Sequence, residues 1–225
     1  MLRTQFEEEL LNLHNQFYEM GMMVSSAVHK SVRSYIDHDK KLAQEVIDHD
    51  IEINDMEVRL EKKSFEMIAL QQPVTTDLRT IITIMKASSD LERMEHHAVS
   101  VAKSTIRLKG LPRILEVEKE INEMSNYVKK MVDNVLIAYV KTDEKDARMI
   151  AKMDERVNDY FQKIYDMTTN TMEKESDTII SGTDYLHVAG YLERVGDYVT
   201  NICEWIVYLA TGKITELNSN RNETF

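Results

Sequence analysis

Carboxylate and amide side chains recur at helical spacing in the C-terminal half of the chain. Glu193, Asp197 and Asn201 follow one another at steps of four, and Asp154 and Asn158 have the same spacing. In a helix each of these groups lies along one face. Clustered carboxylates repel one another and are costly to keep ionised unless a cation neutralises them. The residue types therefore indicate a metal site, with oxygen donors that suit hard or borderline cations.

The N-terminal half has the same kind of pattern, with one histidine. Asp50 and Asn54 are four residues apart, as are Glu92 and His96. An imidazole among oxygen donors shifts the preference toward iron, manganese or zinc. A single acidic pair at this spacing is usually no more than a solvated helix face. The appearance of the pattern in both halves favours metal binding, but spacing alone leaves both interpretations open.

Long amphipathic helices are the elements that would carry these side chains. Leu10, Leu13, Phe17, Met20 and Val24 fall at steps of three and four, as one face of a helix should. Six glycines and two prolines are too few for the turns of a β-sandwich or barrel, so we expect an all-α fold. Helices are predicted over residues 3–37, 39–70, 74–109, 114–141, 143–173 and 176–212.

Particular residues account for the breaks between these helices. Asp39 and Asp143 are predicted N-caps, because a short side-chain acceptor satisfies the free amides of a first turn. Pro73 lacks an amide hydrogen and is predicted in the first turn of the third helix. Gly110 is predicted as a left-handed C-cap, after which Pro112 prevents continuation.

The chain also contains an internal repeat. Residues 35–55 match residues 139–159 at an offset of 104, and Leu91-Glu92-Arg93 matches Leu192-Glu193-Arg194 at an offset of 101. The repeat predicts two tandem, pseudo-symmetric three-helix bundles. We place the first copy at residues 1–111 and the second at residues 112–225.

The repeat leaves the packing of the two copies open. They could lie around a pseudo-two-fold axis, or they could stack into one longer bundle.

Composition excludes several classes of protein. The formal net charge of −11 argues against nucleic acid or bare anionic lipid as the main ligand. The single cysteine, Cys203, permits no intramolecular disulfide. We predict that it is a small, buried apolar side chain. The sequence has no apolar signal core, no uncharged apolar stretch of about 18 residues and no nucleophile or phosphate-loop motif. We therefore expect a cytoplasmic protein that is not an enzyme.

Two segments carry a family resemblance. Residues 68–98 contain Gln-Pro-Val-x-x-Asp-Leu-Arg followed by Leu-Glu-Arg, and residues 191–213 contain Leu-Glu-Arg followed by Asn-Ile-Cys-Glu and Tyr-Leu-x-x-Gly-Lys. This combination resembles the PhoU family of phosphate-signalling regulators, over about residues 1–215.

The resemblance implies that each acidic motif helps to bind metal ions, in some members as multinuclear clusters. Iron, zinc, manganese and magnesium are all open. His96 departs from the pattern, because it stands where the second copy has Asp197, and Glu95 stands where the second copy has Gly196. Carried over by position, the predicted metal ligands are Asp50, Asn54, Glu92, His96, Asp154, Asn158, Glu193 and Asp197.

The resemblance also implies a homodimeric adaptor. Such an adaptor restrains phosphate uptake and phosphate-starvation signalling by linking the ATPase of the phosphate ABC transporter to a membrane sensor histidine kinase. It would meet the membrane only through these partners. A metal-free helical scaffold and a metal-dependent phosphohydrolase are the alternatives.

Overall fold

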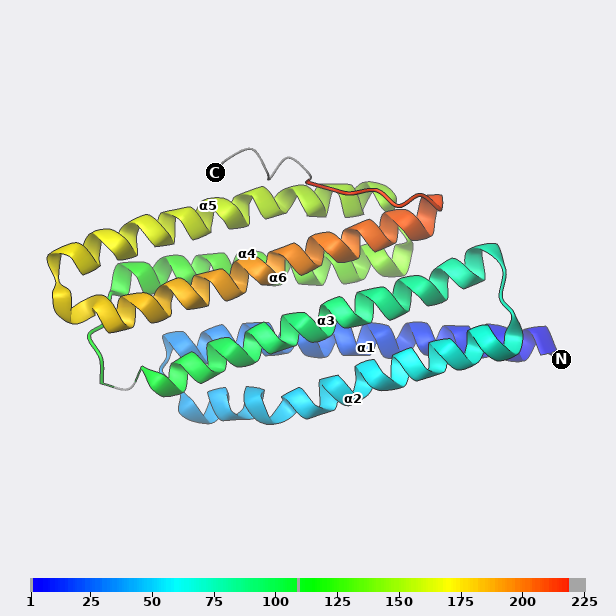
Figure 1. Ribbon diagram of the computed structural model, residues 1–225, viewed down its shortest axis with the longest axis horizontal. Helices are drawn as coiled ribbons and strands as arrows, with labels where there is room; N and C mark the ends of the chain where they lie inside the picture. Colours follow the sequence, from blue (N-terminus) through cyan, green and yellow to red (C-terminus); the bar gives the residue numbers. More distant parts are fainter. Residues whose placement is uncertain (1, 109, 219–225) are drawn as a thin grey trace.

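Six long helices make up the computed structural model, which describes residues 2–108 and 110–218 (Figure 1). No strand occurs in those ranges, so the all-α prediction is confirmed. A single 3₁₀ turn, η1, joins the last two helices. The helices are α1 (Leu2–Ile36), α2 (Lys40–Gln71), α3 (Thr75–Arg107), α4 (Leu115–Lys141), α5 (Glu144–Lys174) and α6 (Ile179–Thr211), with η1 at Ser176–Thr178.

Both predicted aspartate N-caps are present. The Asp39 side chain accepts hydrogen bonds from the amides two and three residues on, at 3.0 and 3.1 Å. Asp143 accepts the equivalent pair at the start of α5, both at 3.0 Å. The repeat thus extends to the capping chemistry of its second helix.

The predicted position of Pro73 is wrong. Gln72 ends α2 in the left-handed conformation, with its N–H on the Ile68 carbonyl, and Val74 then runs extended before α3 begins at Thr75. Proline disfavours helical backbone in the residue before it, so Pro73 separates the two helices instead of opening the third. Gly110 is left-handed as predicted, with φ of 83°, but lies beyond the C-cap of α3 at Leu108.

The two copies lie side by side, with α1 against α4 and α3 against α6 (Figure 1). A glycine allows α1 and α4 to approach, since a Cβ at Gly21 would collide with the Leu136 side chain. The Ser25 hydroxyl donates to Asp133 of α4 at 2.6 Å. The end-to-end arrangement that the sequence left open is therefore excluded.

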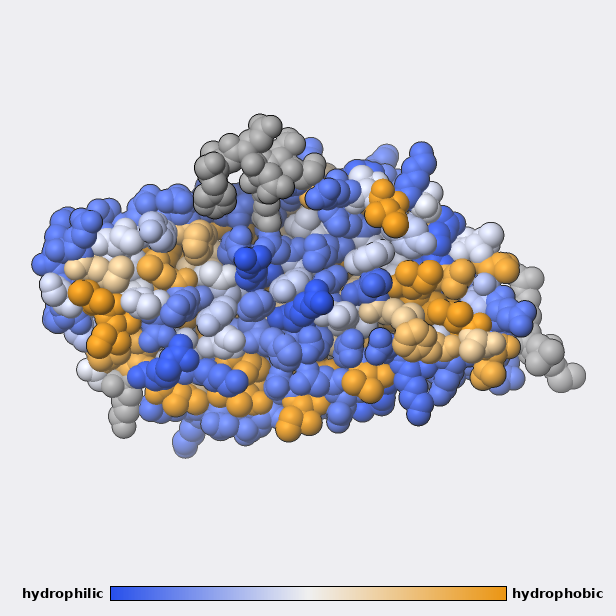
Figure 2. Space-filling model, viewed as in Figure 1, coloured by the Kyte–Doolittle hydropathy of each residue, from blue (hydrophilic) through white to orange (hydrophobic). Residues whose placement is uncertain are grey.

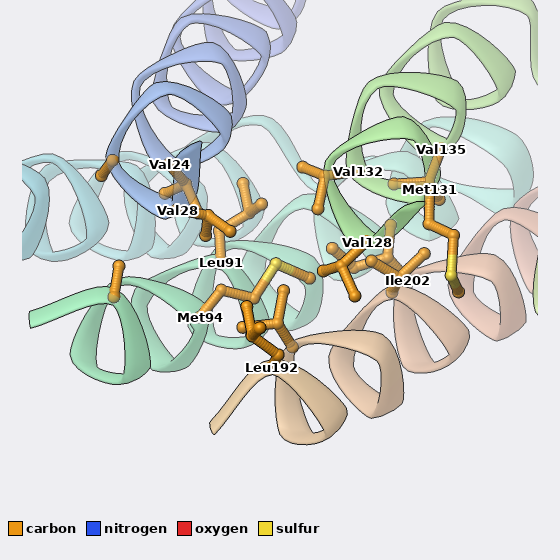
Figure 3. Close-up of a cluster of buried hydrophobic side chains, with 14 of the residues drawn as sticks. Val24, Val28, Leu91, Met94, Val128, Met131, Val132, Val135, Leu192 and Ile202 are labelled. Carbon is orange, nitrogen blue, oxygen red and sulfur yellow. The ribbon is translucent and has the colours of Figure 1, made fainter. Parts of the chain in front are cut away.

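One hydrophobic core spans both copies. Figure 3 shows Val28 of α1 and Met94 of α3 packed toward Val132 of α4 and Leu192 of α6, and all four are buried. Each such side chain contributes about 1.5–3 kcal/mol on burial. The two repeats consequently fold as one body. The boundary between residues 111 and 112 stays a prediction of where the first repeat ends and the second begins.

An ion pair between the exposed Arg113 and the buried Glu118 ties the connection between the copies to both of them. Glu118 of α4 is buried and accepts a hydrogen bond from the Tyr185 hydroxyl of α6 at 2.7 Å. Arg113 pairs with Glu118 and also donates to the Ile36 carbonyl at the end of α1. A buried carboxylate is tolerated because these donors compensate its lost hydration.

The end of α6 meets the start of α3. Gly212 caps α6 in the left-handed conformation, with φ of 74°, and a Cβ there would collide with the guanidinium of Arg79. Gly212 and Arg79 belong to the two motifs that carried the family resemblance. This contact is a structural reason for a glycine at position 212 and an arginine at position 79. Among the described helices, none is long and apolar enough to cross a membrane.

Candidate metal centre

In the second copy, α6 carries a pair of partly buried acids, Glu193 and Asp197. Burial raises the pKa of both carboxyls, and the negative charge of Asp197 raises the pKa of Glu193 further. Arg194 lies beside them, with its Nη1 donating to Asp197 Oδ2 at 3.3 Å and its Nε 3.8 Å from Glu193 Oε2. The pair therefore holds more negative charge than the single neighbouring cation offsets.

Asp154 of α5 is fully buried against α6. A Cβ at Gly196 would lie 2.7 Å from Asp154 Oδ1, so the glycine makes room for the carboxylate. Asn158 is one turn further along α5 and is half-buried. The predicted ligands of this copy thus come from the facing helices α5 and α6, and Asp154 approaches the turn that holds Glu193 and Asp197.

In the first copy, α2 and α3 bring three predicted ligands together. His96 Nε2 lies 3.0 Å from Glu92 Oε1 and 3.9 Å from Asp50 Oδ1. The buried Asn54 Oδ1 forms no hydrogen bond with the described residues. The structure thus brings Asp50, Glu92 and His96 together between α2 and α3, and their role as metal ligands stays a prediction.

Glu95 is the residue that the ligand prediction left out. Its side chain is completely buried on α3, and both carboxyl oxygens are without a hydrogen bond in the described structure. Burial raises the pKa of Glu95 to about 8, with a further contribution from the charge of Asp50. The available signal was a glutamate on the same helix face as the buried Leu91 and Ala98.

Glu95 explains why the two copies differ. Gly196, its repeat equivalent, leaves space in which Asp154 is buried. In the first copy the glutamate occupies that side of α3, and Asp50, the equivalent of Asp154, stays partly exposed. At this place in the repeat each copy has one fully buried carboxyl, Glu95 or Asp154, but a different helix supplies it.

The polar stripe of α6 does not face α5 along its whole length. Asn201 donates to Asp90 Oδ1 of α3 at 3.3 Å, across the boundary between the copies. Burial raises the pKa of Asp90 to about 6. At its C-terminal end the stripe therefore faces α3 of the first copy.

The predicted ligands in the described part of the chain form pairs of acids, not a closed set of side chains around one metal ion. Within residues 2–108 and 110–218, no three His, Cys, Asp or Glu side chains are arranged to hold one metal ion. Paired acids with neighbouring amide oxygens can still bind a cation that keeps several waters, as magnesium usually does. Cys203 is buried as predicted, and burial raises the pKa of its thiol, so it is poorly suited to act as a nucleophile.

Comparison with known proteins agrees with the fold and its repetition. The PhoU domain model matches residues 17–105 and again residues 121–206. The chain is 37% identical, over 219 residues, to the phosphate-specific transport system accessory protein PhoU homolog of Clostridium acetobutylicum, which covers 97% of this chain and 100% of that protein. The homolog from Streptococcus pneumoniae serotype 4 is 34% identical, with 96% of this chain and 100% of that protein covered.

Solved structures give the same result. The crystal structure of the phosphate transport system regulatory protein PhoU from S. pneumoniae matches with a TM-score of 0.89 and 32% identity, over 94% of this chain and 100% of that one. PhoU from Pseudomonas aeruginosa matches with a TM-score of 0.88 and 32% identity, over 92% of this chain and 100% of that one. The chain belongs to the PhoU family and carries the family's domain twice.

Proposed function

We propose that this protein is a cytoplasmic regulator of phosphate transport that acts as an adaptor, not as an enzyme. It restrains phosphate uptake and phosphate-starvation signalling by linking the phosphate transporter ATPase to a sensor histidine kinase. The supporting observation is similarity over 97% of the chain to a phosphate-specific transport system accessory protein, whose whole length is covered. The homodimer expected from the family resemblance belongs to the same proposal.

Metal binding is part of the proposal. Glu193 and Asp197, with Asp154 and Asn158, would hold a cation in the second copy. A bound cation supplies positive charge, which favours the ionised form of acids whose pKa burial has raised. The equivalent residues of the first copy, Asp50, Asn54, Glu92 and His96, would hold a cation there, with an imidazole in place of the second acid.

A groove between α1 and α2 suits a basic protein partner. It has a volume of about 400 Å³, and Met22, Met23 and Ile53 belong to its apolar lining. Flexible methionines adapt to side chains of different shape. Three acids outnumber the two basic groups that line the same groove, which favours an apolar partner segment flanked by basic residues. The acids are Glu19, Glu45 and Glu52, and the basic groups are Lys30 and His49.

Co-purification from membranes tests the adaptor. The chain carrying a cleavable tag is expected to retain the phosphate transporter ATPase or the sensor kinase. Reversing two charges of the groove, with Glu45→Lys and Glu52→Lys, should reduce that recovery at least tenfold. Glu155→Lys, an exposed substitution on α5, is the matched control. Recovery of neither partner by the unaltered chain would refute the adaptor.

Elemental analysis separates the metal-binding adaptor from its alternatives. Protein purified without an affinity tag should contain metal, and a chelator should lower its melting temperature. Metal-free protein whose melting a chelator and added cations leave unchanged would favour the plain helical scaffold. Turnover of phosphoesters by metal-loaded protein would favour the phosphohydrolase.

A further inference from the structure

The outer face of α2 carries a stripe of three exposed apolar residues. Ile51, Val58 and Phe65 follow at seven-residue steps and are 68%, 59% and 55% exposed. At the rise of an α-helix the stripe is about 21 Å long. Figure 2 shows apolar atoms interrupted by polar ones along the lower edge of the molecule, where Figure 1 places α2.

The internal repeat shows that the fold does not require this stripe. Core positions keep their character between the copies, as with Leu60 of α2 and Ile164 of α5, both fully buried. The three stripe positions correspond instead to Glu155, Gln162 and Thr169 of α5, which are all polar. A helix with the same role in the other copy thus carries a solvated face, and α2 is the exception.

The charges along the stripe match a second copy of the same stripe. Asp55 and Lys62 are both exposed and lie on the stripe face on either side of Val58, three residues before it and four after it. Two antiparallel α2 helices related by a two-fold axis at Val58 would place Ile51 against the partner's Phe65. The same rotation places Asp55 against the partner's Lys62, twice per pair. Seven residues are about two helical turns, so the stripe stays on one face of α2.

We propose that α2 is the surface through which two copies of this chain form an antiparallel, isologous dimer. Isologous contacts use one patch on both subunits, and the stripe is self-complementary in this sense. This surface specifies how the homodimer of the proposed function would form, so it rests on that proposal. It does not depend on metal binding. Three apolar residues on each side make an interface smaller than the standard ~1,600 Å², so we expect a weak dimer whose population depends on protein concentration.

Sedimentation velocity over a range of concentrations tests the proposal. Val58→Glu places like charges together at the two-fold axis and should raise the dissociation constant at least tenfold. Because position 58 is exposed, this variant should melt like the unaltered chain. Gln162→Glu, the repeat-equivalent change on α5, should leave the dissociation constant unchanged.

A charge exchange makes the test specific for the antiparallel pairing. Asp55→Lys should weaken the dimer, and adding Lys62→Asp to it should restore affinity, because each opposite-charge contact is formed again. A dimer that Val58→Glu leaves intact would refute this surface while leaving the homodimer standing. A chain that stays monomeric would refute both the α2 surface and the homodimer. If Val58→Glu then abolished recovery of the transporter ATPase, the stripe would be assigned to the ATPase instead.

Discussion

The buried carboxyl of Glu95 should make the stability of the metal-free protein fall as the pH rises. Its pKa rises from an ordinary 4.5 to about 8 in the folded state, so the folded chain holds this proton more tightly than the unfolded chain does. The stabilisation is complete below the unfolded pKa and is lost as the pH rises through the folded pKa. By linkage, this one group should cost about 4 kcal/mol of stability between about pH 5 and about pH 9.

Glu95→Gln removes the proton while keeping the shape of the side chain. Urea unfolding of both proteins in chelator should give a difference in unfolding free energy that grows by about 4 kcal/mol in favour of the variant over that pH range. Glu155→Gln, at an exposed site on α5, should show no such growth. If the difference between Glu95→Gln and the unaltered chain were the same at both ends of the range, the burial argument would be refuted.

Three further outcomes follow from the local structure. Gly196→Ala should destabilise the chain by about 1–3 kcal/mol in urea unfolding, because its methyl group meets the Asp154 carboxylate. Gly190→Ala, where a methyl group has room, should be neutral or stabilising by up to about 1 kcal/mol. Equal effects of the two substitutions would contradict the packing around Gly196. Asp143→Ala should lower stability by about 1 kcal/mol through loss of the cap of α5, measured in the same way; an unchanged unfolding midpoint would contradict this. The Cys203 thiol should react with an aromatic disulfide reagent only when the chain unfolds, and rapid modification of native protein would show that it is not buried.

Local features of the sequence predicted the helices well. The apolar spacing of α1 and the caps at Asp39 and Asp143 depend on residues within a few positions of one another, and both are confirmed. Pro73 was wrongly placed inside α3 because the conformations of Gln72 and Val74, not Pro73 alone, determine where that helix begins.

Contacts between helices were only partly predictable. The repeat identified Asp50, Glu92 and His96 as one group, and the structure brings them together. Apolar periodicity indicates which face of a helix points inward, but not how deeply each side chain is buried. It therefore could not show that Glu95 is fully buried while His96 is exposed. The side-by-side packing of the copies depends on close approaches such as that of Gly21 to α4, which a single helix does not reveal.

Phosphate uptake by living cells tests the proposed function most directly. A bacterial strain that lacks its own PhoU gene should take up labelled phosphate faster than its parent when phosphate is plentiful. Expression of this chain from a plasmid should return uptake to the parental rate, because the proposed adaptor restrains the transporter. Uptake that stays at the deletion-strain rate, although the folded chain accumulates and binds the transporter ATPase, would contradict a restraining role.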